Sequence, residues 1–158
     1  MHFNWLFHST ESAGEQVRNS PNIILIMLDD LDYHDLGCYW NKNHLTPNND
    51  NLAKNGIRFT DFHSNGAVCS LTRAALMTGR HQQRVRIEGV VTALNHRYTG
   101  LDPTEITIAD FFKKQDYKTG LIGKWHLEYD TIFSHTKNGF NYFKGFVSGN
   151  IDYHSHVD

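Results

Sequence analysis

The sequence places a cysteine and an arginine four positions apart at the start of a helical pattern. Cys69 comes directly before residues 70–78, which have helical periodicity, and Arg73 would lie one turn further along the same face. A helix N-terminus carries unpaired N–H groups and a partial positive charge, so it favours an anion or a thiolate. A side chain able to act as a nucleophile, a guanidinium and a helix start therefore converge on a site suited to an oxyanion such as sulfate or phosphate.

Two further polar clusters follow apolar segments that have the character of strands. Asp29 and Asp30 end one such run, and Lys124 and His126 follow another. Adjacent carboxylates indicate either a hard divalent metal with oxygen ligands or a solvated turn. Lys124 and His126 could supply charge to an oxyanion and a proton to a leaving group, or they could be a surface lysine beside a packed Trp-His pair. The coincidence of three clusters at such positions is stronger evidence for a site than any one of them.

The spacing around these residues excludes two common phosphate sites. Cysteine phosphatases place an arginine six positions after the cysteine, where this chain has Ala75. A phosphate-binding loop needs a glycine five positions before Gly123 and a serine or threonine after Lys124, but positions 118 and 125 hold lysine and tryptophan. Cys69 is therefore either a thiolate activated by the helix start and Arg73 or a small buried hydrophobic residue.

The remaining pattern predicts the elements that position these clusters. Short apolar or alternating runs predict strands, and runs with helical spacing and capping residues predict helices. We expect strands at 22–28, 57–62 and 117–122, with 139–149 ambiguous between strand and loop. We expect helices at 47–53, with Asn55-Gly56 as the C-terminal stop, from about 70 and from about 107. The first strand is of the kind buried on both faces of a parallel sheet. Alternating strands and helices predict an α/β fold with a mostly parallel sheet flanked by helices and a site at the carboxyl ends of the strands.

The composition limits the class of protein. The chain has 158 residues, a net charge of −2 at pH 7 and 39% hydrophobic residues, which indicates one soluble globular domain. We predict no nucleic-acid partner, because there is no broad basic field, and no membrane span, because no apolar run approaches about 20 residues. Residues 1–20 lack the basic start and the sustained apolar stretch of an intact signal peptide. We expect a polar, irregular leader there and one domain at 21–158.

The two cysteines are too few for a disulfide framework, although they could form one bridge. If Cys69 is used chemically, Cys38 is expected to be a buried free thiol. Neither an H-E-x-x-H nor a C-x-x-C pair indicates zinc.

Taken together, these motifs closely resemble those of the formylglycine-dependent sulfatases of the alkaline-phosphatase-like superfamily. The resemblance runs from about Pro21 to the end of the chain, with two signatures in the family's order. The matching segments are residues 21–30, 46–48, 69–79 and 117–126. Family members are considerably longer, so the resemblance implies an apparently truncated N-terminal portion of the domain, with further ligands beyond Asp158. An isolated portion of this kind is expected to be inactive.

The resemblance implies a modified nucleophile and a metal. Cys69 would be oxidised to formylglycine by a formylglycine-generating enzyme, and its hydrated aldehyde would attack the sulfur of a sulfate ester. A divalent metal, calcium in most relatives, would be held partly by Asp29 and Asp30 and would contact the formylglycine formed from Cys69.

The resemblance also implies roles for three basic residues. Arg73 would steady the modified side chain, Lys124 would bind the sulfate, and His126 would orient or protonate neighbouring oxygens. The substrate would be an aryl or carbohydrate sulfate.

Three positions depart from the family pattern. Leu71 replaces the proline that usually stands two positions after the cysteine, and a proline there would fix φ and remove an N–H. Asp116 and Trp40 occupy positions that are often glycine. We expect the backbone at both to avoid positive φ, which side chains other than glycine tolerate poorly.

Two alternatives remain open from the sequence. One is a phosphonate or phosphate ester hydrolase of the same superfamily, which would use the same machinery. The other is a non-catalytic remnant that binds at most a metal or an oxyanion. Relatives are often periplasmic, secreted or lysosomal, and the sequence leaves the compartment of this chain undecided.

Overall fold

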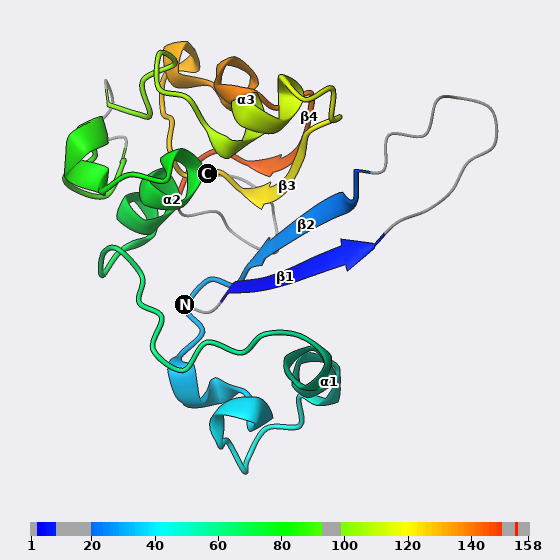
Figure 1. Cartoon of the computed structure of the whole chain (residues 1–158). Helices are drawn as coiled ribbons and strands as arrows, with labels where there is room; N and C mark the ends of the chain where they lie inside the picture. The colour runs from blue at the N-terminus through cyan, green and yellow to red at the C-terminus, as the bar shows by residue number, and fades with distance from the viewer. Residues whose placement is uncertain (1–2, 9–19, 93–98, 150–153, 155–158) are drawn as a thin grey trace. The chain divides into compact units, whose positions relative to one another are not determined.

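The computed structural model describes residues 3–8, 20–92, 99–149 and 154, which belong to two compact units. The first unit comprises residues 1–64 and the second 65–158. Figure 1 labels the helices and strands of both units.

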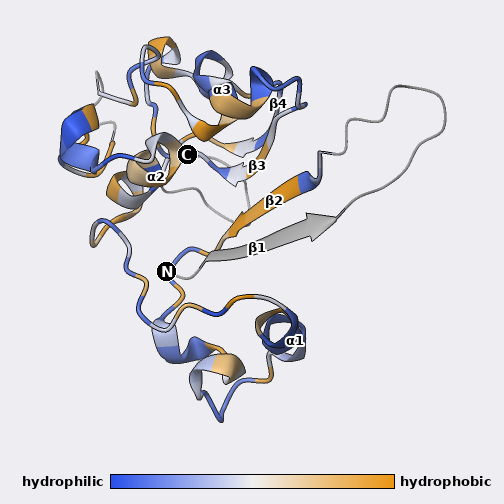
Figure 2. Cartoon of the chain, in the orientation of Figure 1, coloured by the Kyte–Doolittle hydropathy of each residue, from blue (hydrophilic) through white to orange (hydrophobic). Residues whose placement is uncertain are grey.

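The first unit begins with a two-stranded antiparallel sheet. β1 (Phe3–His8) pairs with β2 (Asn22–Met27) in a register that runs from Phe3 opposite Met27 to His8 opposite Asn22. The prediction of an irregular leader is therefore wrong for the residues of β1, whose aromatic and apolar composition favours a strand. The prediction of a parallel, doubly buried β2 is also wrong, because β1 pairs with it antiparallel and alternate residues remain half exposed. Figure 2 shows that most of β2 is hydrophobic.

The predicted helix that begins at Pro47 is confirmed. It is α1 (Pro47–Asn55), with the proline in the first turn and Gly56 as the C-cap, whose N–H donates to the carbonyl of Leu52. Two 3-10 helices, Tyr33–Asp35 and Gly37–Tyr39, precede it.

Residues 57–62 do not form the predicted strand. Tyrosine hydroxyls use the backbone carbonyls of this segment: Tyr39 donates to Phe59 at 2.8 Å and Tyr33 donates to Thr60 at 3.1 Å. The alternating side chains also lack a buried face, since Ile57 is 84% exposed. The alternation of residue types was not enough to produce a strand without a partner strand.

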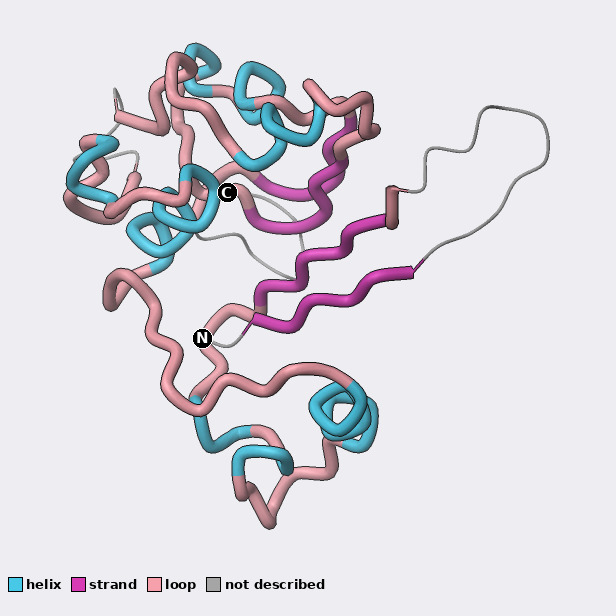
Figure 3. Tube along the Cα trace, viewed as in Figure 1, coloured by secondary structure: helices cyan, strands magenta, loops and turns pink. Residues whose placement is uncertain are grey.

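The second unit carries a parallel pair of strands with helices. It contains α2 (Cys69–Thr78), α3 (Ile108–Lys113), β3 (Gly120–Lys124) and β4 (Tyr142–Phe146), together with the 3-10 helices Gln82–Val85, Thr131–Phe133 and His135–Asn138. β3 and β4 pair in parallel and lie side by side in Figure 3. The α/β class and the parallel pairing are confirmed here, and β4 resolves the ambiguity of residues 139–149.

α3 begins with the predicted capping box. Thr107 accepts a hydrogen bond from the Asp110 N–H at 3.1 Å, and the Asp110 carboxylate accepts from the Thr107 N–H at 3.0 Å. The helix ends in a turn in which the Tyr117 N–H donates back to Phe112 and Asp116 has φ of 63°. Because this turn uses Tyr117, β3 begins at Gly120 rather than at 117, and Lys124 becomes its last residue.

The expectation about φ at the two departures from glycine is wrong. Asp116 has φ of 63° and Trp40 has φ of 71°, so both have the left-handed conformation that glycine adopts most easily. Asp is among the residues that tolerate this region, whereas tryptophan is not. The backbone at these two turns is therefore left-handed, with a conformational strain energy that glycine would not have.

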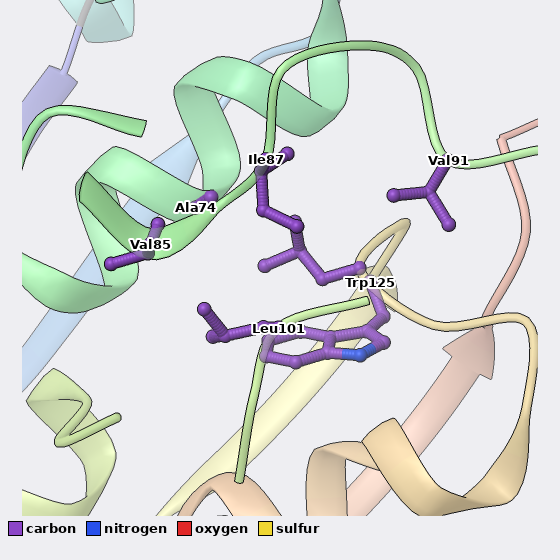
Figure 4. Packing of buried hydrophobic residues seen from close by; sticks show 7 residues of the cluster. Ala74, Val85, Ile87, Val91, Leu101 and Trp125 are labelled. Carbon is purple, nitrogen blue, oxygen red and sulfur yellow. The ribbon is translucent and has the colours of Figure 1, made fainter. Parts of the chain in front are cut away.

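An apolar cluster in the second unit joins the elements that carry the candidate site. Figure 4 shows how its side chains pack around Trp125. The cluster consists of Ala74, Val85, Ile87, Val91, Leu101, Trp125 and Leu127, each at most 2% exposed. Full burial stabilises a side chain of this size by roughly 1.5–3 kcal/mol. The core thus fixes α2 through Ala74 and the segment after β3 through Trp125.

Candidate active site

Cys69 and Lys124 are brought together by α2 and β3. Cys69 is the first residue of α2 and Lys124 the last residue of β3, and the Lys124 ammonium Nζ lies 3.4 Å from the Cys69 Sγ. The two residues are 55 positions apart in the sequence, so the fold creates this contact. It places a cation directly beside the side chain that is the candidate nucleophile.

Arg73 lies on the same helix and points to the same strand end. Its guanidinium is largely buried, at 9% exposed, and its Nη1 donates to the backbone carbonyl of Lys124. Arg73 therefore ties the second turn of α2 to the end of β3. The sequence-based role of steadying a modified Cys69 stays a prediction.

His126 is buried among backbone groups. The residue is 2% exposed, and its Nε2 donates to the Val91 carbonyl at 3.0 Å. A carbonyl can only accept, so Nε2 carries a proton in this hydrogen bond. The backbone of His126 has φ of 57°, and its N–H donates to the Val147 carbonyl at 2.9 Å. A Cβ on Gly149 would overlap the imidazole, so the ring position depends on that glycine.

Sequence reasoning missed Ser70. Its hydroxyl, fully buried, donates to the His126 carbonyl at 3.0 Å and accepts from the Val91 N–H at 3.1 Å. A polar residue beside Cys69 at a helix start was a usable signal. The contribution of Val91 comes from backbone atoms, which the sequence does not reveal.

Leu71, in place of the usual proline, lies in the first turn of α2. Its side chain packs against the apolar cluster, and a Cβ on Gly66 would be 2.7 Å from the Leu71 Cβ. The first-turn N–H groups of a helix have no intrahelical acceptor, so neither residue type is excluded there by hydrogen bonding.

The predicted metal ligands Asp29 and Asp30 belong to the first unit. They form an exposed turn directly after β2, and Asp30 has φ of 54°. Two adjacent carboxylates fit the oxygen preference of a hard divalent cation but supply too few ligands for the six to eight that calcium takes. Among the described residues, no group of three or more His, Cys, Asp or Glu side chains that could hold a metal ion is found.

Cys38 is a free thiol in the first unit, as is Cys69 in the second. Burial, followed by the Asp50 carboxylate, raises the pKa of the Cys38 thiol above its ordinary value of 9.0. The Cys38 N–H donates to Asp50 Oδ1 at 2.7 Å, and the Arg58 guanidinium donates to the Cys38 carbonyl. Cys38 is half-buried and lines an open pocket of about 470 Å³.

A membrane-spanning helix is not found in the part of the chain that the structure describes.

Comparison with protein families gives a match to the family described as Sulfatase over residues 21–158. Human arylsulfatase A is 46% identical over 116 residues, which are 73% of this chain and 23% of the relative. Human steryl-sulfatase is 41% identical over 149 residues, which are 88% of this chain and 26% of the relative. The chain therefore spans about a quarter of the length of these curated relatives.

Solved structures give the same fold. The crystal structure of Ps i-CgsB is similar with a TM-score of 0.74 and 34% identity, covering 79% of this chain and 28% of that one. A second structure, Ps i-CgsB in complex with k-i-k-neocarrahexaose, is similar with the same TM-score and 33% identity. The similarity confirms the alkaline-phosphatase-like α/β fold predicted from the sequence.

Proposed function

Because this chain belongs to the sulfatase family, we propose that the protein hydrolyses sulfate esters at a site built on Cys69. The relatives named arylsulfatase and steryl-sulfatase support this reaction class. Since the chain spans about a quarter of their length, its activity is a proposal drawn from the site itself.

The observation that carries the proposal is the contact between Cys69 and Lys124. The Lys124 ammonium lies 3.4 Å from Sγ, where α2 begins. Positive charge from a lysine and from first-turn N–H groups suits an anionic substrate group and stabilises charge that develops on its oxygens.

We assign the chemistry of the nucleophile to a modified Cys69. When converted to formylglycine, this residue supplies a hydrated aldehyde, one hydroxyl of which attacks sulfur while the other later releases sulfate. Lys124 binds a sulfate oxygen and neutralises part of its charge. Arg73 fixes the end of β3 through the Lys124 carbonyl, so that the ammonium stays beside residue 69.

The hydrogen bond from His126 Nε2 to the Val91 carbonyl fixes the position of the imidazole ring. We propose that this ring orients or protonates the oxygens around residue 69.

A divalent metal, calcium in this proposal, would use the carboxylates of Asp29 and Asp30. Their hard oxygen atoms fit such an ion, and other ligands must complete the shell. When bound, the ion supplies positive charge that stabilises a substrate oxyanion.

The substrate class that we propose is an aryl or carbohydrate sulfate. The names of the relatives support an aryl or steryl ester. The complex of Ps i-CgsB with k-i-k-neocarrahexaose supports a saccharide ligand for that protein.

Two measurements, made on protein that extends over the full length of its sulfatase relatives, test the proposal together. Mass spectrometry of the peptide that contains Cys69 reports whether the thiol has become an aldehyde when the protein is expressed with a formylglycine-generating enzyme. Hydrolysis of 4-nitrophenyl sulfate, with and without calcium, reports turnover, and 4-nitrophenyl phosphate is the paired substrate for the phosphatase alternative.

The expected result is an aldehyde at residue 69 and calcium-dependent hydrolysis of the sulfate ester in preference to the phosphate ester. An intact thiol with no turnover in calcium would overturn the proposal. Faster hydrolysis of the phosphate ester would reassign the reaction class while leaving the site in place.

A further inference from the structure

We propose that Ser70 is a positioning residue that holds the start of α2 against the segment after β3 and so sets the distance between Cys69 and Lys124. The inference concerns the site of the proposed function and rests on it for its catalytic meaning. Its structural content can be tested without any turnover.

The Ser70 hydroxyl takes part in a closed set of three hydrogen bonds. Ser70 Oγ donates to the His126 carbonyl at 3.0 Å, and the Val91 N–H donates to Ser70 Oγ at 3.1 Å. The His126 Nε2 then donates to the Val91 carbonyl at 3.0 Å. Three segments that are far apart in the sequence are thus joined at one hydroxyl.

All three residues of this set lie in the interior. Ser70 is 0% exposed, and His126 and Val91 are each 2% exposed. Water cannot replace a lost partner easily at such a place, so an unsatisfied N–H or carbonyl there is costly. The segments are therefore expected to shift when the hydroxyl is removed.

The two hydrogen bonds of the Ser70 hydroxyl restrict which residue types can replace serine at this position. A hydroxyl donates one hydrogen bond and accepts others, and Ser70 uses both capacities at once. Threonine keeps both capacities, whereas alanine and valine have neither. Threonine and valine have nearly the same shape, so this pair isolates the hydroxyl.

Ser70 and its acceptor His126 lie close along the chain to the two residues of the Cys69–Lys124 contact. Ser70 adjoins Cys69, and its acceptor His126 is two residues beyond Lys124. A displacement between Ser70 and His126 is therefore transmitted to the 3.4 Å contact of Lys124 with Cys69. Arg73 also links these two segments, because it binds the Lys124 carbonyl one turn further along α2.

The experiment measures how strongly Cys69 prefers an anionic alkylating reagent. Rates with iodoacetate and with iodoacetamide are compared on protein whose Cys69 mass spectrometry shows to be a thiol, with Cys38→Ala as the background. The ratio of the two rates reports positive charge close to Sγ. Lys124→Gln removes that charge and is expected to lower the ratio of the iodoacetate rate to the iodoacetamide rate about fivefold.

We expect Ser70→Ala and Ser70→Val to lower the ratio about threefold, and Ser70→Thr to keep it. The matched control is Thr78→Ala on the same helix, which removes a hydroxyl that donates to Ala74 at 2.7 Å away from Lys124. That control is expected to leave the ratio unchanged. Circular dichroism checks that each variant is folded, and exchange of the Val91 amide in the unsubstituted protein gives a measurement that needs no variant.

An unchanged ratio in folded Ser70→Val would overturn the proposal, as would rapid exchange of the Val91 amide. In protein that hydrolyses 4-nitrophenyl sulfate, Ser70→Val should lower kcat with Ser70→Thr restoring it. If no variant or parent hydrolyses the ester but the alkylation ratios behave as expected, the proposed function fails while the positioning role stands.

Discussion

The two cysteines of this chain lie in similar secondary structure but face opposite charges. Cys38 lies in a 3-10 helix and Cys69 at the start of α2; each is half-buried and has an arginine that binds a nearby backbone carbonyl. The ionic neighbour of Cys38 is the Asp50 carboxylate, which helps to raise the pKa of its thiol, whereas Cys69 has the Lys124 ammonium at 3.4 Å.

This difference bears on the proposed role of Cys69. Partial burial and a nearby arginine are common to both cysteines, so neither feature distinguishes them. Cys69 differs in having an ammonium rather than a carboxylate beside it and in lying at the start of an α-helix of ten residues.

The largest expected effect separates the two cysteines by activity. In protein that hydrolyses 4-nitrophenyl sulfate, Cys69→Ala should lower kcat by a factor on the order of 10³ or more, because it removes the nucleophile. Cys38→Ala is the matched control and should change kcat by less than about threefold. Equal losses in the two variants would contradict the assignment of the nucleophile.

Much of the region around Cys69 could be predicted from the sequence because local signals agree with the fold there. The helical spacing after Cys69, the capping box of Thr107 with Asp110, and a polar pair after a strand all describe short-range physics. The parallel partner of β3 and the 3.4 Å contact depend on packing, but the rule that sites form at strand ends anticipated the convergence.

In the first unit α1 was predicted, but the strand pairing, residues 57–62 and several backbone details could not be predicted in the same way. Residues 57–62 alternate like a strand, but tyrosine hydroxyls take their carbonyls. The positive φ of Trp40 contradicts its residue type, because the turn requires a left-handed residue whichever side chain it carries. The hydrogen bonds that join Ser70, Val91 and His126 involve backbone atoms, so no residue pattern records them.

The second prediction removes the negative charge beside Cys38. Asp50→Asn removes the carboxylate that, after burial, contributes most to the raised pKa of the thiol, so that pKa should fall. Alkylation of Cys38 by iodoacetamide at pH 8, measured in a Cys69→Ala background, should become several-fold faster. Asn51→Asp, one position along the exposed side of α1, is the control and should not accelerate it. An unchanged rate in Asp50→Asn would mean that burial alone protects the thiol.

The third prediction compares how the two cysteine-bearing helices end. Gly79 has φ of 65° after α2 with open space around it, so Gly79→Ala should lower the free energy of unfolding by about 1 kcal/mol through backbone strain alone. Trp40 has φ of 71° after the Cys38 helix, but its ring contacts Tyr33 and lies under the Arg58 guanidinium.

Trp40→Gly should therefore change stability by less than about 0.5 kcal/mol, since relief of strain offsets the lost ring contacts. Urea denaturation of both variants measures the difference. A loss of more than about 1 kcal/mol in Trp40→Gly would show that the aromatic contacts, rather than the backbone, determine this turn.

The smallest effect is a dependence of stability on alkaline pH that arises in the Cys38 region. Burial raises the pKa of Cys38 above 9.0 and that of its neighbour Tyr39 above 10.0. The folded state then holds these protons more tightly than the unfolded state, so their contribution to stability is complete below pH 9 and declines as the pH rises through the folded pKa values. Urea denaturation between pH 8 and 10.5 should show this decline, and Cys38→Ala should make it shallower. Cys38 is partly exposed, so solvent screening keeps its effect below that of the helix ends. A decline as steep in Cys38→Ala as in the parent would remove Cys38 as its cause and weaken the contrast between the two cysteines.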